Sequence, residues 1–264
     1  MLAKLNSSVP GLYLPRLYLP KLCLPKLYLP RLYLVVFILV VQGGCVSTTG
    51  SIDAYSSEQL ARFSSSEVNQ TISTNGDPYL KYPDRTDPRL RVPEAAVCGV
   101  KVLQENPLRY SLASYSFVAE ASISGADVTH FSSCGTCSTL KDLAVYLGQP
   151  NLTVPVRRCA AFSLIKPLAM QCLKNIGFSN ACAETWYFNA KHTRKNCAAV
   201  CLKSWLAGEP FNNKAGDLNA CLTCDEEYSG PVFKFSAGRT RRNSGITSAI
   251  QRGAEEQSNL QHNY

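Results

Sequence analysis

The chain has 264 residues, among them 12 cysteines, and a formal net charge of +8. Residues 1–45 hold five of the 27 basic residues and no acidic residue, which leaves 22 basic against 19 acidic residues, or +3, for the rest. The excess charge therefore belongs mainly to the N-terminal segment, and we expect no nucleic acid as a partner. So many cysteines favour a protein stabilised by disulfides in an oxidising compartment over a cytosolic protein.

Residues 1–31 contain a basic five-residue repeat, Leu-Tyr-Leu-Pro-Arg/Lys. A proline at every fifth position removes helical hydrogen bonds and clashes with the preceding turn, so the repeat is not a transmembrane helix. We expect this basic leucine- and proline-rich segment to be unfolded, with polyproline-like conformations.

The next segment, residues 32–47, is typical of a signal peptide. Ten apolar residues, Leu32–Val41, follow the basic repeat and are followed by small residues up to Ser47. Such a run is short for a spanning helix and fits the apolar core of a signal peptide, although a retained signal-anchor stays open. If the segment is retained, residues 32–46 contact the membrane. Either way, the rest of the chain enters the secretory pathway and is secreted or anchored by a single pass, outside the cytoplasm.

The remaining chain is predicted to have three parts. Residues 48–97 are rich in Ser, Thr, Asp and Pro without a helical or strand period, which predicts a flexible polar stalk. Residues 98–237 form the cysteine-rich folded domain, and residues 238–264 a basic and then polar flexible tail. Ten cysteines fall inside the domain, and this even number favours a closed disulfide framework. These disulfide candidates are Cys98, Cys134, Cys137, Cys159, Cys172, Cys182, Cys197, Cys201, Cys221 and Cys224.

Helical patterns dominate the domain after a short β element. Alternating sequence around residues 110–117 and 128–131 predicts one hairpin or two short strands. Capping residues and apolar spacing predict helices over residues 138–147, 167–176 and 179–207. The fold class is therefore a mainly α (small α+β) domain, rich in disulfides, with a short β-hairpin. A short helix with Cys221 and Cys224 behind the cap Asp217 is also predicted, as is an edge strand at Val232–Phe235.

The longest predicted helix places three cysteines on one face. At 100° per residue, Cys182 and Cys197 differ by 60°, and Cys201 lies a further 40° round the helix. Since this is the core face, we expect each of the three to bond to another element.

The most suggestive motif is Cys134-Gly135-Thr136-Cys137, between a predicted strand and a predicted helix. A helix start stabilises a thiolate and lowers the pKa of the first cysteine. Locally the motif resembles the thioredoxin family, which implies thiol–disulfide exchange with Cys134 and Cys137 as the catalytic pair. The alternating strand–helix units of that family are absent, so two structural half-cystines in a tight loop remain the other interpretation.

Zinc is a further interpretation of the cysteines. Cys134 and Cys137, together with Cys221 and Cys224, could supply four thiolates. In an oxidising lumen disulfides compete with this site, so neither a metal nor another cofactor is expected.

Three short motifs concern modification. Asn69 and Asn151 each begin an Asn-x-Thr sequon for glycosylation on the exported side. Arg239-Thr240-Arg241-Arg242 matches the Arg-x-Arg-Arg pattern cut by secretory convertases, which need an exposed, flexible substrate.

The sequence thus predicts a secreted or membrane-tethered, disulfide-stabilised extracytoplasmic protein with an interaction or structural role and an unknown protein partner. The alternative is a lumenal thiol–disulfide oxidoreductase that uses Cys134 and Cys137.

Overall fold

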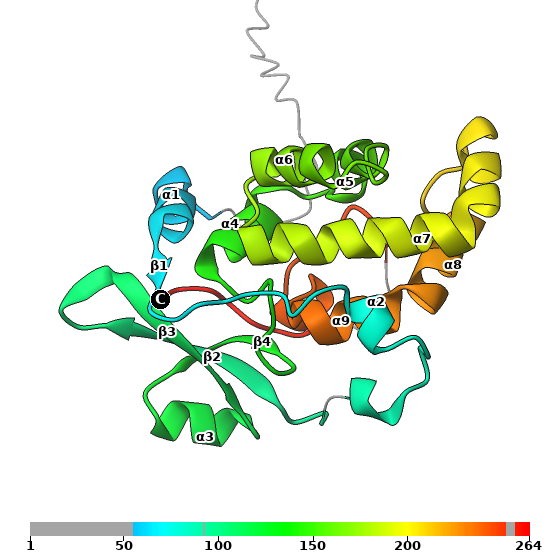
Figure 1. Ribbon diagram of the computed structural model, residues 1–264. Coiled ribbons are helices and arrows are strands. Elements are labelled where there is room, and N and C mark those ends of the chain that lie inside the picture. The colour runs from blue at the N-terminus through cyan, green and yellow to red at the C-terminus, as the bar shows by residue number, and fades with distance from the viewer. Residues whose placement is uncertain (1–54, 92, 252–256) are drawn as a thin grey trace, which may run out of the picture. The chain divides into compact units, whose positions relative to one another are not determined.

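The computed structural model describes residues 55–91, 93–251 and 257–264 (Figure 1). These residues belong to one unit of the chain, Thr49–Tyr264. The predictions for residues 1–31 and 32–47 lie outside the described residues. Within the described ranges, none of the helices combines the length and apolar character that crossing a bilayer takes.

The described residues form nine α-helices, two 3-10 helices and four strands. The helices are α1 (Ser57–Ser65), α2 (Pro78–Lys81), η1 (Pro88–Leu90), α3 (Val118–Ile123), α4 (Leu140–Gly148), α5 (Thr153–Ala160), α6 (Lys166–Ile176), α7 (Asn180–Leu206), α8 (Ala220–Tyr228), α9 (Gly230–Ala237) and η2 (Arg242–Ser244). The strands are β1 (Glu67–Val68), β2 (Val97–Leu103), β3 (Asn106–Tyr115) and β4 (Asp127–Phe131). The protein is therefore mixed α/β: the predicted helices are present, and the two predicted strand segments lie in β3 and β4. They do not form a hairpin with each other, because both pair with β2, a strand that the sequence did not predict.

The sheet has the strand order β1-β3-β2-β4. β2 and β3 form the antiparallel hairpin, with Val100 opposite Leu112, and both side chains are buried. β4 pairs antiparallel with the other edge of β2, whereas the short β1 runs parallel to β3. The sheet packs into the same core as α1, α4 and α7, so the strands and the helices share one hydrophobic interior.

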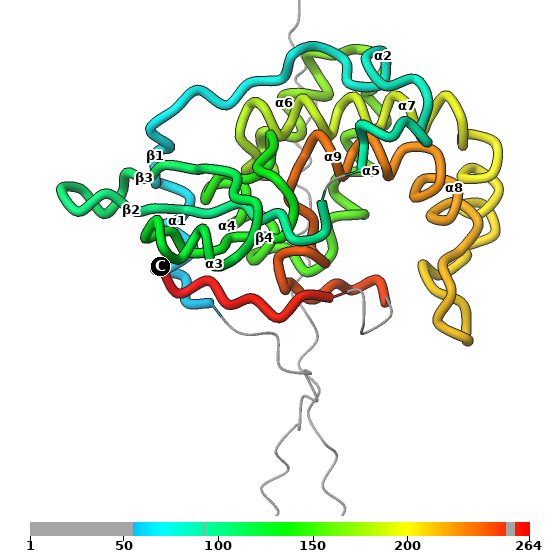
Figure 2. The backbone as a smooth tube through the Cα atoms, turned by 90° about the horizontal axis from the view of Figure 1, so that it is seen from below, coloured from blue at the N-terminus to red at the C-terminus, as the bar shows by residue number. Residues whose placement is uncertain are grey.

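The 27-residue helix α7 organises the helical part of the molecule (Figures 1 and 2). The hydroxyl of Ser179 accepts a hydrogen bond from the Cys182 N–H and caps the N-terminus of α7. Gly177 ends α6 in the left-handed conformation, with φ of +118°, where a side chain would be strained. In Figure 1, α5 and α6 lie on one side of α7, and α8 and α9 on the other.

Five disulfides connect these elements. All ten predicted cysteines are used, in the pairs Cys98–Cys134, Cys137–Cys182, Cys159–Cys172, Cys197–Cys224 and Cys201–Cys221. The expectation for α7 is confirmed, because each of its three cysteines bonds to a residue of another segment. A set of five disulfides indicates an oxidising, extracytoplasmic environment.

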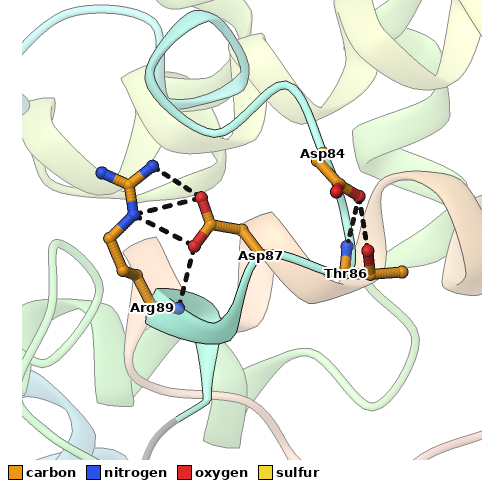
Figure 3. A network of polar contacts seen from close by, with 4 residues as sticks. All are labelled: Asp84, Thr86, Asp87 and Arg89. Carbon is orange, nitrogen blue, oxygen red and sulfur yellow. Dashed lines mark hydrogen bonds and ion pairs between the residues drawn. The ribbon is translucent and has the colours of Figure 1, made fainter.

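The flexible stalk predicted for residues 48–97 is not what the structure shows for its described part. Phe63, Tyr79 and Tyr82 are buried in the main core, and α1 packs against α4. Polar side chains also order the segment (Figure 3). The carboxylate of Asp84 accepts from the N–H and hydroxyl of Thr86, and Asp87 caps η1 while pairing with Arg89. These elements carry few apolar residues, so hydrophobic periodicity did not reveal them.

The flexible tail predicted for residues 238–264 is also corrected in its described part. Arg239, Ile246 and His262 are buried, and the chain end returns to the sheet, where the Tyr264 hydroxyl lies 2.7 Å from that of Thr129. The polar composition of the segment led to the wrong prediction, because its polar side chains are buried and form hydrogen bonds with one another. Examples are His262 with Tyr264 and Arg239 with Ser244.

The predicted edge strand at Val232–Phe235 is instead the helix α9. Pro231 lies in its first turn, where the missing N–H costs nothing, and Gly238 follows its last residue. Val232 and Ala237 of this helix are buried. They are five positions apart, so the alternation of apolar and polar residues over Val232–Phe235 did not reveal that the segment is helical.

Candidate functional site

The Cys134-Gly135-Thr136-Cys137 loop does not contain an internal disulfide. Cys134 bonds to Cys98 on β2, and Cys137 bonds to Cys182 on α7. Thiol–disulfide exchange by this motif requires that its two cysteines alternate between a dithiol and a disulfide with each other. The pairing in the structure does not provide this, and Cys137, Cys182 and Cys98 have no exposed surface.

The surroundings of the loop are also those of a structural element. α4 begins only at Leu140, capped by Thr139, so neither cysteine lies in its first turn. The N–H groups of Thr136 and Cys137 donate to the carbonyls of Ser236 and Ala237 at the end of α9. These donors are therefore engaged and do not stabilise a thiolate.

Gly135 allows this close contact with α9. A Cβ atom at Gly135 would lie 2.5 Å from the Ser236 carbonyl oxygen and 2.6 Å from the Gly238 nitrogen. The glycine of the motif is thus explained by packing, because any larger residue would force the loop away from the helix.

The other predicted site residues are dispersed. The four zinc candidates, Cys134, Cys137, Cys221 and Cys224, all lie in disulfides to different partners. Among the described residues there is no group of three or more His, Cys, Asp or Glu side chains arranged to hold a metal ion.

The three arginines of the convertase motif do not form an exposed loop. Arg239 has no exposed surface, and Arg241 and Arg242 are partly buried. Burial lowers the pKa of Arg241 to about 10. The folded protein therefore does not present the extended substrate that a convertase needs.

The two sequons remain predictions. Asn69 is exposed beside β1, and Asn151 is partly exposed in the loop before α5. The Asn151 side-chain oxygen accepts from the N–H of Thr153 at 3.0 Å.

A cavity of about 500 Å³, open to the surface, lies between α5, α7, α8, α9 and the segment after α9. Its walls are mainly apolar and include Val156, Trp186, Leu222, Phe233 and Ile250. Leu202 and Trp205, which are 55% and 65% exposed, lie at its edge near the end of α7. This size and this lining are typical of a site for a small organic molecule.

Two buried polar atoms in the cavity wall have no hydrogen-bond partner within the described structure, Tyr146 Oη and Trp186 Nε1. Burial raises the pKa of Tyr146, which keeps its hydroxyl neutral, and the nearby Asp142 carboxylate adds to this rise. The neighbouring Trp186 side chain opposes this rise in pKa. Buried polar atoms without partners are uncommon, so the pair is suited to contacting a ligand.

Charged residues surround part of the cavity. Burial raises the pKa of Asp225, while a hydrogen bond from the Thr193 hydroxyl lowers it. Glu226 accepts from Lys234 at 3.0 Å and from Arg242 at 3.1 Å. In total, five basic and two acidic residues line the cavity, so the net formal charge of its lining is positive. The basic residues are Arg157, Arg194, Lys234, Arg241 and Arg242, and the acidic ones are Asp225 and Glu226.

Sequence reasoning missed this cavity. Its lining comes from Tyr146 on α4 through to Ile250 beyond η2, and no single segment contributes a pattern that marks a binding site. The one available signal was the position of both tryptophans of the chain, Trp186 and Trp205, on the same long helix.

The fold and the cavity together define a mixed α/β protein held by five disulfides, with a mainly apolar internal site. Residues 166–260 match the model of a family described as "Family of unknown function (DUF8771)". The match spans 95 of the 264 residues. It includes α6 to α9, of which α7, α8 and α9 line the cavity, and it leaves out the sheet. No curated protein and no solved structure matches the chain.

Proposed function

We propose that the chain is a disulfide-stabilised extracytoplasmic binding protein that takes a small, mainly apolar molecule into the cavity beside α7. The proposal rests on one observation, a pocket of about 500 Å³ whose mainly apolar wall contains two buried polar atoms, Tyr146 Oη and Trp186 Nε1, without a well-formed hydrogen bond among the described residues. Apolar walls favour a hydrophobic ligand, and the polar atoms favour a ligand with one hydrogen-bonding group at a fixed place.

A non-catalytic role fits the chemistry around the cavity. Tyr146 and Trp186 can form hydrogen bonds with a bound molecule, while the Asp225 carboxylate already accepts from Thr193. The proposal includes that the protein is either secreted or, if residues 32–46 are retained, tethered to a membrane by that segment. Thiol exchange has no comparable support, because Cys134 and Cys137 are bonded to separate partners.

Both tryptophans of the chain line the cavity, so intrinsic fluorescence reports its occupancy. The test is a titration with 1-anilinonaphthalene-8-sulfonate, an apolar probe with one anionic group, followed by energy transfer from tryptophan. We expect saturable binding of one probe per chain.

Two neighbouring alanines of α7 give a matched pair of variants. Ala198 lines the cavity and Ala199 does not, although both are exposed. Ala198→Phe fills part of the space and is expected to weaken probe binding about tenfold or more, while Ala199→Phe leaves it unchanged. Equal binding by the two variants, or no saturable binding by the parent protein, contradicts the proposal.

A further inference from the structure

A second feature lies on the helices α5, α6 and α7, in residues 143–208. This segment has eight basic residues and one acidic residue, a net charge of +7. The basic residues are Arg157, Arg158, Lys166, Lys174, Lys191, Arg194, Lys195 and Lys203, and the acidic one is Glu184. The rest of the chain after residue 45 has 14 basic and 18 acidic residues, or −4. The positive charge of the exported part is therefore concentrated here.

All eight basic side chains are exposed. The three helices pack against one another and form one layer of the molecule (Figure 1). Within the described part of the chain, two of them form ion pairs: Lys166 with Glu184, and Lys191 with Asp77. The layer therefore keeps a positive surface that attracts anionic partners.

The loop between α5 and α6 adds exposed apolar side chains to this basic layer. Leu164 is 80% exposed, and Phe162, Ile165 and Leu168 are each close to half exposed. Single exposed apolar residues need no explanation, but four of them within seven residues form a patch that favours an apolar partner.

The loop is held in a fixed conformation. The Cys159–Cys172 disulfide closes it at its base, and the buried Ser163 accepts a hydrogen bond from Arg194 of α7 at 3.0 Å. The N–H of Ile165 donates to the Phe162 carbonyl at 2.8 Å. The apolar tip is thus presented without a further loss of backbone freedom on binding.

We propose that this loop and the basic layer around it dock on an anionic lipid bilayer. Leu164 and its apolar neighbours enter the interface between headgroups and acyl chains, and Arg157, Arg158 and Lys174 face the anionic headgroups. An acidic protein or polysaccharide would match the charge, but it offers no apolar phase for Leu164. The combination of a fixed apolar tip and a basic surround favours the bilayer.

Vesicle flotation tests this surface with matched variants of the whole exported chain. We expect binding to phosphatidylcholine vesicles that contain phosphatidylserine, weaker binding to phosphatidylcholine alone, and release at high salt. Leu164→Ser should weaken binding by about tenfold, whereas Leu80→Ser should not, although Leu80 is also 80% exposed, on α2.

A charge-reversed pair separates the two contributions. Arg158→Glu should weaken binding to the anionic vesicles, and Lys214→Glu, at an exposed position outside the layer, should leave it unchanged.

The proposal is overturned if the parent protein does not float with anionic vesicles, or if Leu164→Ser binds like Leu80→Ser. Loss with Arg158→Glu but not with Leu164→Ser would assign the surface to an acidic macromolecule instead. Ala198→Phe, which fills the cavity, should float normally, so the two proposals fail independently.

Discussion

Arg239 and Thr129 are 110 positions apart in the sequence, yet the Arg239 guanidinium donates to the Thr129 carbonyl at 3.0 Å and to its hydroxyl at 2.6 Å. The same guanidinium donates to the carbonyls of Cys137 and Ser138, each at 3.1 Å. Burial lowers the pKa of Arg239, and nearby tyrosines and Asp142 oppose this effect. One buried cation thus fastens the C-terminal segment to β4 and to the loop before α4.

Replacement of Arg239 by methionine is expected to destabilise the protein strongly. It leaves several buried carbonyls without donors, and the expected loss in the free energy of unfolding is about 3 kcal/mol or more. Arg91→Met, at an exposed arginine, should change stability by less than about 0.5 kcal/mol. Urea unfolding of the two variants measures the difference, and similar midpoints would show that the Arg239 contacts contribute little.

The burial of Arg239 also predicts resistance to proteolysis. A convertase that cuts after Arg-x-Arg-Arg should leave the folded, oxidised protein intact and should cut it after reduction and unfolding. Mass spectrometry after incubation with the enzyme tests this expectation. Release of residues 243–264 from the folded protein would mean that the segment opens readily, against the buried contacts described here.

Two tyrosines that differ in hydrogen bonding provide a further test. Tyr146 Oη is buried and has no hydrogen-bond partner among the described residues, whereas the Tyr79 hydroxyl donates to Asn189 at 2.7 Å and lies 3.0 Å from the Ser229 carbonyl. Tyr146→Phe should therefore keep or raise the free energy of unfolding, and Tyr79→Phe should lower it by about 1–2 kcal/mol. Thermal unfolding compares them, and an equal loss in both variants would show that the Tyr146 hydroxyl is satisfied in solution.

Stability should also fall in mild acid because of His262. Its Nε2–H donates to the Ser244 carbonyl at 2.8 Å, so Nδ1 of the neutral ring accepts from Tyr264. Burial, followed by the charge of Arg239, lowers the pKa of His262 from 6.5 to about 4. In the unfolded chain the His262 ring takes up a proton near pH 6.5, whereas in the folded protein it does so only near pH 4. The contribution of His262 to the free energy of unfolding is therefore complete above pH 6.5 and decreases as the pH falls towards 4. The decrease from this residue is about 2 kcal/mol at pH 5.

The variant His262→Gln keeps one donor and one acceptor but does not titrate. Urea unfolding at several pH values should therefore give a smaller decrease in stability below pH 6.5 for the variant than for the parent protein. Burial also lowers the pKa of His130, so part of the pH dependence should remain. Parallel pH profiles would show that folding does not lower the pKa of His262.

The sequence predicted the features that local chemistry decides. Gly177 ends α6 in the left-handed conformation, and Ser179 caps the start of α7. Helical periodicity placed Cys182 and Cys197 on the core face of α7. The even number of cysteines also predicted complete pairing. These predictions succeeded because each depends on residues that are close in the chain.

The failures concern residues whose partners are far away in the sequence. Phe63 and Tyr79 are isolated apolar residues in polar segments, and only tertiary contacts show that they belong to the core. In the same way, Arg239 reads as a basic surface residue until its carbonyl partners on β4 and before α4 are known. The cavity was missed for the same reason, because no single segment of the sequence encodes it.

The pairing of Cys134 with Cys98, and of Cys137 with Cys182, has a consequence for how the protein matures. In an unfolded chain, cysteines three positions apart meet far more often than cysteines 36 or 45 positions apart. We therefore expect local pairs, Cys134 with Cys137 and the equally spaced Cys221 with Cys224, among the first disulfides formed during oxidation, and neither pair occurs in the structure. Reaching the native bonds requires thiol exchange on a timescale of seconds to hours, so the yield of folded protein depends on an isomerase or a thiol buffer in the compartment where it is made.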